Sequence, residues 1–328
     1  MIARAPGVVK LFGEHAVVYN RLALSSAVSL KAQVKATSSK NISLVLKDLK
    51  KRKSFSLKEA EKLWESYEKS PDEKKLKLSQ DPFMPFLAIY ANALKLSSKR
   101  IGIKAEISSE IPMASGFASS AACSSAFAIA ASKILKLKLD ENQLIELANF
   151  GDKVAHLNPS GVDVATSMLG GFVSFRKSEG AKKLKIKTKL KMIAAYAGER
   201  RTSEMVERVA RFREQDRWGI EALFNNIETT TLKGIEALKE KDFETFGKAI
   251  DEAQEYLREL GVSTSEIERI VNIARIYGGH AKISGAGGGG IVIIFAKDYS
   301  RIKKALEDQK FKVFEFELGE KGAIELSE

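Results

Sequence analysis

The feature that most constrains this chain is a stretch of 22 residues without a charge, from Ile111 to Ser132. Its length matches a bilayer span, but it holds Pro112, Gly116 and six serines, and most of its residues are small. Small and polar residues contribute too little transfer free energy for a transmembrane helix. We therefore expect a tight loop followed by a buried helix over 118–136, and no membrane span.

The rest of the chain has the composition of a folded globular protein. Its 328 residues suit two packed domains, and 44% are hydrophobic and 29% charged. The single cysteine, Cys123, cannot form an internal disulfide, which is typical of a reducing compartment. Because no basic segment leads into an apolar one after Met1, no secretory signal is visible and we expect a cytoplasmic protein.

Two basic runs carry almost all of the formal net charge of +12. Residues Lys47–Lys53 contribute five basic side chains against Asp48, and Arg176–Lys191 contribute eight against Glu179. The second run alternates apolar and basic residues over 184–190, which predicts an edge strand whose lysines prevent aggregation. It contains no aromatic residue to stack on a base, so we expect no nucleic-acid partner. The charge can still attract small anions.

Hydrophobic periodicity predicts helices and strands in both halves of the chain. Strands are expected at 2–10, 21–38, 101–108, 172–176, 191–197 and 291–295. Helices are expected at 55–70, 83–97, 118–136, 140–150, 203–260 and 264–277, and a further helix and strand follow at the end. The second basic run separates two halves of similar pattern, so we place the boundary between domains of residues 1–183 and 184–328.

The segment Ile111–Ala122 is expected to bind phosphate. A strand ends, small residues turn, and a helix begins at the pair Ser119 and Ser120. The first turn of a helix presents unpaired N–H groups and the positive end of the helix dipole, which together bind anions. No Lys-Ser or Lys-Thr pair follows a glycine at the Walker spacing, so this is another kind of phosphate loop. A serine that only caps the helix is the alternative.

A second loop, Lys282–Gly290, has glycine at five of the six positions from Gly285. Ordering so many glycines costs conformational entropy, which indicates special dihedral angles or a close approach of the backbone. The loop precedes the apolar strand at 291–295, whereas a dinucleotide-binding glycine motif follows a strand and opens a helix. A flexible turn is the alternative.

A third segment, Gly7–Tyr19, places three polar side chains among apolar neighbours next to a glycine turn. These are Lys10, Glu14 and His15. They lack the spacing of metal-ligating histidines, because no second histidine is near. The alternative is that these three are ordinary surface side chains without a role in a site.

A fourth segment, Gly151–Asp163, has a carboxylate on either side of a Pro-Ser-Gly turn, Asp152 and Asp163. Such a turn can present Asp163 into a cleft. The alternative is that Asp163 caps a helix that begins near Val164.

Taken in order, these four segments resemble the GHMP kinase superfamily, and within it the mevalonate kinases. The opening Pro-Gly-x-x-Lys-x-x-Gly-Glu-His-Ala-Val-Val-Tyr resembles mevalonate kinases, whereas galactokinases continue Gly-Glu-His with Thr-Asp-Tyr. Pro112–Ala122 is similar to the phosphate loop Pro-x-x-x-Gly-Leu-Gly-Ser-Ser-Ala-Ala. His156–Asp163 matches His-x-x-Pro-Ser-Gly-x-Asp, and Lys282–Gly290 matches the C-terminal glycine motif. Together the motifs span residues 4–290.

The resemblance implies an α+β fold, the GHMP kinase fold. Its N-terminal, ATP-binding domain is of the ribosomal-protein-S5 type, its C-terminal domain is ferredoxin-like, and the active site lies in the cleft between them. It implies ATP-dependent phosphorylation of the C5 primary hydroxyl of (R)-mevalonate to 5-phosphomevalonate, an early step of isoprenoid biosynthesis. Mg²⁺ is the implied cofactor, and mevalonate and ATP are the implied partners. Whether the chain forms a homodimer stays open.

The resemblance also implies site residues. Asp163 is the catalytic carboxylate, and Lys10 pairs with it, keeps it ionised and stabilises charge in the transition state. Mg²⁺ would be held by Ser120 and Asp152. ATP would contact residues in and just before the phosphate loop, namely Ser109, Pro112, Ala114, Ser115, Gly116, Phe117, Ala118, Ser119 and Ser120. Mevalonate would contact residues from three motifs and one further segment, namely Lys10, Glu14, His15, Asp163, Thr202, Gly285 and Ala286.

Two positions depart from the family pattern. Ala118 stands where the phosphate loop usually has glycine, and a left-handed backbone there would be strained. Asp152 stands where mevalonate kinases usually have glutamate, so we expect its shorter side chain to reach Mg²⁺ through a water.

Three alternatives to a mevalonate kinase follow from the same residues. Phosphomevalonate kinase and diphosphomevalonate decarboxylase bind the same carbon skeleton, but the Gly-Glu-His opening favours mevalonate kinase. From another class, a basic nucleic-acid-binding protein without catalysis would use the charge of +12. That interpretation leaves Asp163 and the glycine motif without a role.

Overall fold

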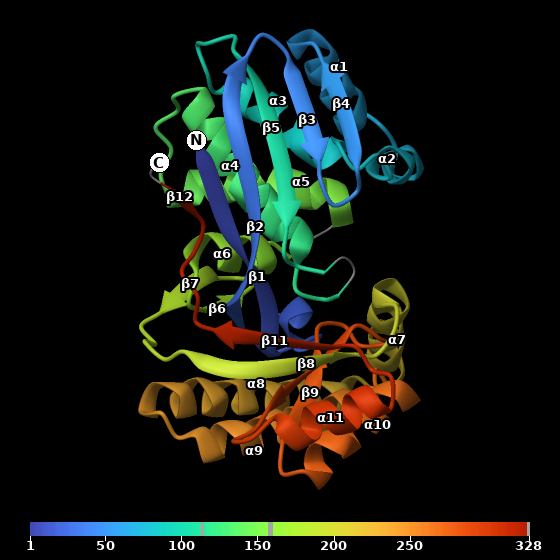
Figure 1. Ribbon diagram of the computed structural model, residues 1–328. Coiled ribbons are helices and arrows are strands. Elements are labelled where there is room, and N and C mark those ends of the chain that lie inside the picture. Colours follow the sequence, from blue (N-terminus) through green and yellow to red (C-terminus); the bar gives the residue numbers. More distant parts are fainter. Residues whose placement is uncertain (113–114, 157–159, 327–328) are drawn as a thin grey trace.

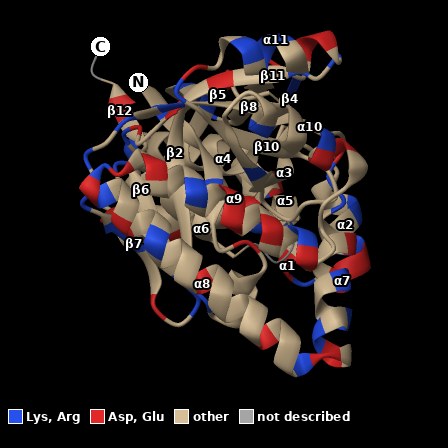
Figure 2. Cartoon of the chain, turned by 90° about the horizontal axis from the view of Figure 1, so that it is seen from below, with Lys and Arg blue, Asp and Glu red and all other residues tan. Residues whose placement is uncertain are grey.

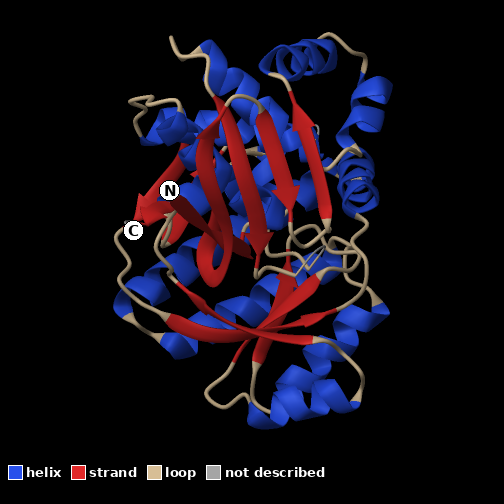
Figure 3. Cartoon of the chain, turned by 45° about the horizontal axis from the view of Figure 1, so that its top comes forward, coloured by secondary structure: helices blue, strands red, loops and turns tan. Residues whose placement is uncertain are grey.

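The computed structural model describes residues 1–112, 115–156 and 160–326, so Ala114, an expected nucleotide contact, lies outside the described residues. Within them, twelve strands form one hydrogen-bonded sheet that turns between an upper and a lower half of the molecule (Figure 1, Figure 3). The strands are β1 (Ile2–Phe12), β2 (Ala23–Ser39), β3 (Ile42–Leu46), β4 (Lys51–Phe55), β5 (Gly102–Ser109), β6 (Phe172–Arg176), β7 (Gly180–Leu184), β8 (Leu190–Tyr196), β9 (His280–Ser284), β10 (Ile291–Phe295), β11 (Val313–Leu318) and β12 (Ile324–Leu326).

The helices of the described residues are one short 3-10 helix and eleven α-helices. They are η1 (Ala16–Tyr19), α1 (Leu57–Glu68), α2 (Asp72–Ser79), α3 (Met84–Lys95), α4 (Ser119–Ile134), α5 (Glu141–His156), α6 (Val162–Leu169), α7 (Thr202–Gln215), α8 (Arg217–Glu240), α9 (Phe243–Glu259), α10 (Ser265–Ile276) and α11 (Ser300–Asp308). The mixture of helices and antiparallel strands confirms the expected α+β class.

The long strand β2 organises the upper half. Its residues 32–39 pair with β5 and its residues 23–26 with β6, while β1 pairs antiparallel along its other edge. Strand β3 pairs in parallel with β5, and β4 forms the outer edge. Helices α3, α4 and α5 pack together, and α4 contacts β1 and β2 (Figure 1).

Most of the uncharged stretch belongs to the helix α4, which is buried over most of its length. This confirms the expected buried helix, whereas the expected tight loop includes residues 113–114, which lie outside the described residues. Its alanines and serines let α4 lie close to both β1 and β2, because small side chains permit short distances between backbones. No described helix is long and apolar enough to cross a bilayer.

The lower half is built on the antiparallel strands β11, β8, β10 and β9, in that order. Helices α9 and α10 contact β9, and α8 packs on α9. Strand β11 joins this layer to the upper half through the pairing of Leu318 with Val28. The buried ring of Phe117 packs edge-on against Phe314 and Phe316 of β11. The two halves therefore share a hydrophobic core.

The domain boundary expected between residues 183 and 184 stays a prediction. These two residues belong to β7, which pairs with β6 of the upper half. The last strand, β12, returns to the upper half and pairs with β1. The chain thus crosses between the halves more than once.

The edge strand expected over 184–190 is wrong. Strand β7 ends at Leu184, residues 185–189 have no regular structure, and β8 begins at Leu190. Burial still alternates along the segment, with Thr188 buried and the neighbouring lysines exposed. An extended segment with one buried side shows the same alternation of buried and exposed residues as a strand, although it forms no ladder of backbone hydrogen bonds.

Candidate active site

The structure brings Lys10 and Asp163 together although 153 positions separate them. Lys10 lies near the end of β1, where the register with β2 shifts between Lys10 and Phe12, and such irregularities redirect side chains. Its Nζ donates to Oδ2 of Asp163 at 2.6 Å, and each side chain is 25% exposed. Gly161, not Asp163, occupies the N-cap of α6, so the capping alternative for Asp163 is wrong.

The second carboxylate oxygen of Asp163, Oδ1, is buried without a hydrogen-bond partner among the described residues. A buried polar atom left unpaired costs free energy, so such an atom indicates a place for a ligand. Asp152 lies nearby on α5. Burial, and then the negative charge of Asp163, raise the pKa of Asp152, whereas His156 and Lys10 oppose that shift. The charged groups therefore form one electrostatic cluster.

The expected magnesium ligands Ser120 and Asp152 are in contact. The hydroxyl of Ser120, in the first turn of α4, donates to Oδ1 of Asp152 at 3.3 Å. It also lies 3.0 Å from Nε2 of His156, at the end of α5. The sequence motifs predict no separate role for His156, and the available signal is its place at the start of the motif that ends at Asp163.

These donors fit Mg²⁺. The serine hydroxyl and the Asp152 carboxylate offer the hard oxygen ligands that Mg²⁺ prefers. Among the described residues, no group of three or more His, Cys, Asp or Glu forms a cage for a metal. Mg²⁺ does not require one, because it is commonly held by one or two carboxylates, with waters and substrate phosphates completing its shell.

Helix α4 begins as a phosphate site requires. Its N-cap residue, Ala118, is left-handed with φ 52° and ψ 48°, and no side chain caps the helix. The alternative of a capping serine is therefore wrong. A left-handed alanine costs on the order of 1 kcal/mol, so the departure from glycine is a strained position. Ser109 at the end of β5 lies close, with its Oγ 3.4 Å from Oγ of Ser119.

The described part of the loop before α4 is anchored on both sides. Oγ of Ser115 donates to the carbonyl of Pro112 at 2.5 Å. The carbonyl of Phe117 accepts a hydrogen bond from the N–H of Val8 in β1 at 2.9 Å. Gly116 between them has a φ of 99°, which favours glycine. Phe117, where the family pattern has leucine, uses its ring to fix the loop in the core.

The first motif is joined to the glycine motif by a buried ion pair. Lys282 Nζ donates to Oε1 of Glu14 and to the carbonyl of Ile283, and the Lys282 and Glu14 side chains are 0% and 3% exposed. Burial lowers the pKa of Lys282, while the charge of Glu14 and its hydrogen bond raise it. The sequence motif predicts no role for Lys282 beyond its place as the first residue of the motif. A lysine inside an apolar strand pattern is the available signal.

Two further hydrogen bonds run between the same segments. Nε2 of His15 lies 2.8 Å from the carbonyl oxygen of Ala286, and burial lowers the pKa of His15. The N–H of Lys10 donates to Oγ of Ser284 at 3.0 Å. Strand β9 and the loop after it therefore position both the backbone of Lys10 and the turn that follows it. That Glu14, His15 and Ala286 contact mevalonate stays a prediction.

The other two expected mevalonate contacts are Thr202 and Gly285, and they belong to two segments that contact each other. Thr202 is exposed at the start of α7, and Gly285 begins the glycine loop with a φ of 102°. The segment before Thr202 pairs with the end of that loop. Gly290 donates its N–H to the carbonyl of Gly198 and accepts from the N–H of Ala197, both at 2.8 Å.

The glycine loop is packed against other backbone. A Cβ added at Gly287 would lie 2.4 Å from the carbonyl oxygen of Val262, and the N–H of Gly288 donates to that oxygen at 2.9 Å. This favours the close-approach interpretation of the motif over a flexible turn.

We expect Gly287→Ala to lower the free energy of unfolding well beyond the effect of Gly278→Ala. Both glycines have nearly the same φ, 77° and 76°, but a Cβ at Gly278 meets nothing within 4 Å. The control therefore isolates the dihedral cost of about 1–2 kcal/mol, and the difference reports the backbone clash. Urea unfolding and turnover assays on both variants measure it. Equal effects of the two substitutions would contradict the close-approach interpretation.

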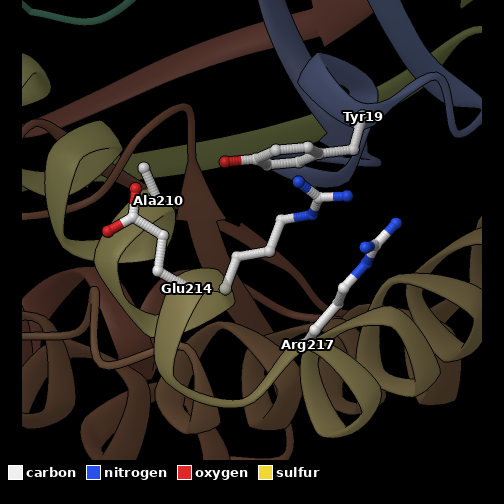
Figure 4. A pocket seen from close by; sticks show the side chains of 5 residues that line it. Tyr19, Ala210, Glu214 and Arg217 are labelled. Atoms are coloured by element: carbon white, nitrogen blue, oxygen red, sulfur yellow. The ribbon is translucent and has the colours of Figure 1, made fainter.

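A pocket of about 480 Å³ lies beside the end of the first motif, lined by Tyr19, Ala210, Arg213, Glu214 and Arg217. The guanidinium of Arg213 stacks on the ring of Tyr19, with its central carbon 4.9 Å from the ring centre. Figure 4 shows Arg217 extending from its helix toward Tyr19. None of the expected site residues lines this pocket, and Arg213 also forms an ion pair with Glu221 at 2.8 Å.

Known proteins share both the sequence and this fold. Residues 87–171 match the GHMP kinases N terminal domain, and residues 235–311 match the GHMP kinases C terminal family. A mevalonate kinase of Methanocaldococcus jannaschii is 31% identical, with 96% of this chain and 98% of the relative covered. One of Archaeoglobus fulgidus is 31% identical over 89% and 91%.

A solved structure extends the likeness to three dimensions. The crystal structure of the Methanococcus jannaschii mevalonate kinase superposes with a TM-score of 0.82 at 29% identity, and covers 97% of this chain and 98% of its own. The paired Lys10 and Asp163, the uncapped α4 and the packed glycine loop occur in a chain that matches these relatives over nearly its whole length. The chain belongs to the GHMP kinase superfamily and, within it, to the mevalonate kinase family.

Proposed function

We propose that this chain transfers the γ-phosphoryl group of ATP to the C5 primary hydroxyl of (R)-mevalonate, giving 5-phosphomevalonate. The observation that carries the proposal is the carboxylate of Asp163, with one oxygen held by Lys10 at 2.6 Å and the other buried without a partner. A substrate hydroxyl that donates to Oδ1 would satisfy that oxygen and hold the nucleophile in place.

In this mechanism Asp163 orients the hydroxyl more than it deprotonates it. A carboxylate is a weak base for an alcohol, and phosphoryl transfer depends mainly on positioning and charge stabilisation. Lys10 keeps Asp163 in the required orientation, and its ammonium stabilises negative charge that develops on the transferred group. Ser284 supports Lys10 through the backbone.

The nucleotide phosphates would lie at the N-terminus of α4. The helix has no side-chain cap, so its first N–H groups and the dipole can bind phosphate oxygens. Ser120 and Asp152 would hold Mg²⁺, which when bound neutralises phosphate charge. Mevalonate would contact the remaining expected residues, namely His15, Glu14, Thr202, Gly285 and Ala286. The cytoplasmic location stays a prediction.

A nucleic-acid-binding function has less support. Acidic and basic residues are interspersed along α9 and α10 (Figure 2), and many of them form ion pairs, such as Lys248 with Glu244 and Arg275 with Asp251. A helix with mixed charge does not present the continuous positive surface that phosphate backbones select.

The test is ADP release from Mg-ATP with mevalonate, 5-phosphomevalonate, 5-diphosphomevalonate or galactose as separate acceptors. We expect release with mevalonate only, with the product identified by mass spectrometry. Release only with a phosphorylated mevalonate would assign the chain to a later step on the same carbon skeleton. No release with any acceptor would refute the proposal.

A further inference from the structure

We propose that Ser25 and Thr166 are positioning residues, whose buried hydroxyls hold the carboxylate of Asp163 at the right distance from its lysine partner. This inference rests on the proposed function, in which Asp163 orients the acceptor hydroxyl while Lys10 pairs with it. It gives a role to a pair of hydroxyls that belongs to none of the four sequence motifs.

Lys10 and Ser25 lie opposite each other on neighbouring strands. They are paired residues of the antiparallel strands β1 and β2, and the side chains of such a pair point to the same face of a sheet. The N–H of Lys10 also donates to Oγ of Ser284 on β9 at 3.0 Å. The backbone of Lys10 is therefore fixed by contacts with two other strands.

Helix α6 carries both Asp163 and Thr166. The two residues are three positions apart, which places their side chains next to each other on one face of the helix. The helix packs against β1, β2 and β6 (Figure 1). It therefore presents to the strands the carboxylate of Asp163 and, almost one turn later, the hydroxyl of Thr166.

The hydroxyls of Ser25 and Thr166 meet where this helix lies against β2. Their oxygens are 2.6 Å apart, and the two residues are 1% and 0% exposed. The hydroxyl of Ser25 also donates to the carbonyl of Val173 in β6 at 3.3 Å. Because a hydroxyl has a single hydrogen, Thr166 is then the donor in the shorter bond. A buried polar group that loses its partner costs free energy, so this contact fixes the distance between α6 and β2.

These contacts close a ring of four residues. Backbone pairing joins Lys10 to Ser25, and the hydroxyls join Ser25 to Thr166. A turn of α6 joins Thr166 to Asp163, and the ion pair of 2.6 Å leads back to Lys10. Of the two links between helix and strands, the ion pair is partly exposed in the site, whereas the hydroxyl contact is buried. The buried link therefore sets how far the helix with Asp163 lies from the strand with Lys10.

A purely structural role is the alternative for this hydroxyl pair. Buried hydroxyls are normally paired whether or not they lie near a site. That alternative predicts a loss of stability without a change in turnover. A positioning role predicts a lower kcat, because phosphoryl transfer depends on the placement of the acceptor hydroxyl, while the KM of each substrate stays near the wild-type value.

The experiment compares Thr166→Val and Ser25→Ala with two matched controls by steady-state kinetics with Mg-ATP and mevalonate. Thr231→Val removes a hydroxyl of α8 that is 0% exposed and donates to a carbonyl of its own helix at 2.8 Å. Ser167→Ala removes another buried hydroxyl of α6, which donates to a carbonyl of β1 at 2.7 Å. A further variant, Thr166→Ser, keeps the hydroxyl.

We expect Thr166→Val and Ser25→Ala each to lower kcat about tenfold, with the KM of both substrates within about twofold of the wild type. The double variant should lose no more than either single variant, because both substitutions remove the same contact. Thr166→Ser and the two controls should keep kcat near the wild-type value. Melting temperatures measure how much stability each variant loses.

Crystal structures of the wild type, Thr166→Val and Thr231→Val add a readout that does not depend on turnover. We expect the distance between Nζ of Lys10 and the carboxylate of Asp163 to exceed hydrogen-bond range in Thr166→Val only.

The outcomes separate this inference from the proposed function. In an active enzyme, an unchanged kcat or an unchanged distance in Thr166→Val would overturn the inference and leave the kinase proposal intact. An equal loss of kcat in Ser167→Ala would also overturn it, because any loosening of α6 would then explain the effect. A wild type that phosphorylates no acceptor would refute the proposed function, and the distance between Lys10 and Asp163 would still decide whether the hydroxyls position that pair.

Discussion

Asp163→Asn is expected to lower kcat by about 10²–10⁴-fold. Asparagine keeps the size of the side chain and an oxygen that can face Lys10, but it removes the negative charge. The ammonium of Lys10 then loses its counter-ion. With the amide oxygen toward Lys10, the NH₂ group takes the place of Oδ1 and cannot accept a hydrogen bond from the acceptor hydroxyl, which is then no longer oriented. Because the site is partly exposed, with both side chains at 25%, the fold should survive the change. Steady-state kinetics and thermal unfolding measure the two effects.

The matched control is Asp251→Asn on α9, in the lower part of Figure 1. Asp251 also pairs with basic side chains, Arg275 at 3.1 Å and His280 at 2.6 Å, and its side chain is 29% exposed. The same chemical change there should leave kcat near the wild-type value. If Asp163→Asn retained more than about a tenth of the activity, the role assigned to Asp163 would be wrong.

Lys282→Met is expected to lower the free energy of unfolding by about 3–5 kcal/mol. The substitution leaves the carboxylate of Glu14 unpaired in a site where its side chain is 3% exposed. Desolvation of one unpaired charge costs far more than the pair contributes when both charges are present. Urea unfolding measures the loss. Lys248→Met on α9, where Lys248 pairs with Glu244 at an exposed position, should change stability little.

A double variant separates the structural role of the pair from a role in substrate binding. Lys282→Met combined with Glu14→Leu removes both charges and should recover most of the lost stability. If Glu14 also contacts mevalonate, the recovered protein should still show a raised KM for mevalonate. A double variant that stays as unstable as Lys282→Met would contradict the account of the buried pair.

Strands β3 and β4 show where pattern reasoning is limited. Residues 42–46 and 51–55 form β3 and β4, two strands that the sequence pattern does not predict, because basic residues on the second strand hide any alternation of apolar and polar positions. The edge strand expected over 184–190 failed for the opposite reason, since alternation was present without backbone pairing. A hydrophobic pattern indicates which side of a segment is buried. Whether the segment forms a strand depends on whether another strand lies next to it in space and can accept and donate backbone hydrogen bonds.

The helical stretch expected over 203–260 divides into three helices. Asp216 accepts from the N–H of Gly219 and begins α8, and Asp242 accepts from the N–H of Thr245 and begins α9. Both caps are aspartates in a highly charged sequence, so they resembled ordinary surface residues. The side-chain oxygen of a cap replaces a missing backbone partner, which is why it begins a helix.

The sequence by itself determined the chemistry of this protein: the small-residue loop before α4, the carboxylates of Asp152 and Asp163, Lys10, and the glycines of the last motif. Short motifs carry such information because the chemistry needs particular groups at particular spacings along the chain. Only the tertiary structure decided which of these groups meet. The pairings of Lys10 with Asp163, Glu14 with Lys282, and Asp48 with Ser109 join residues that are 153, 268 and 61 positions apart. No local pattern encodes such distances, because they follow from how the strands of one sheet are ordered and packed.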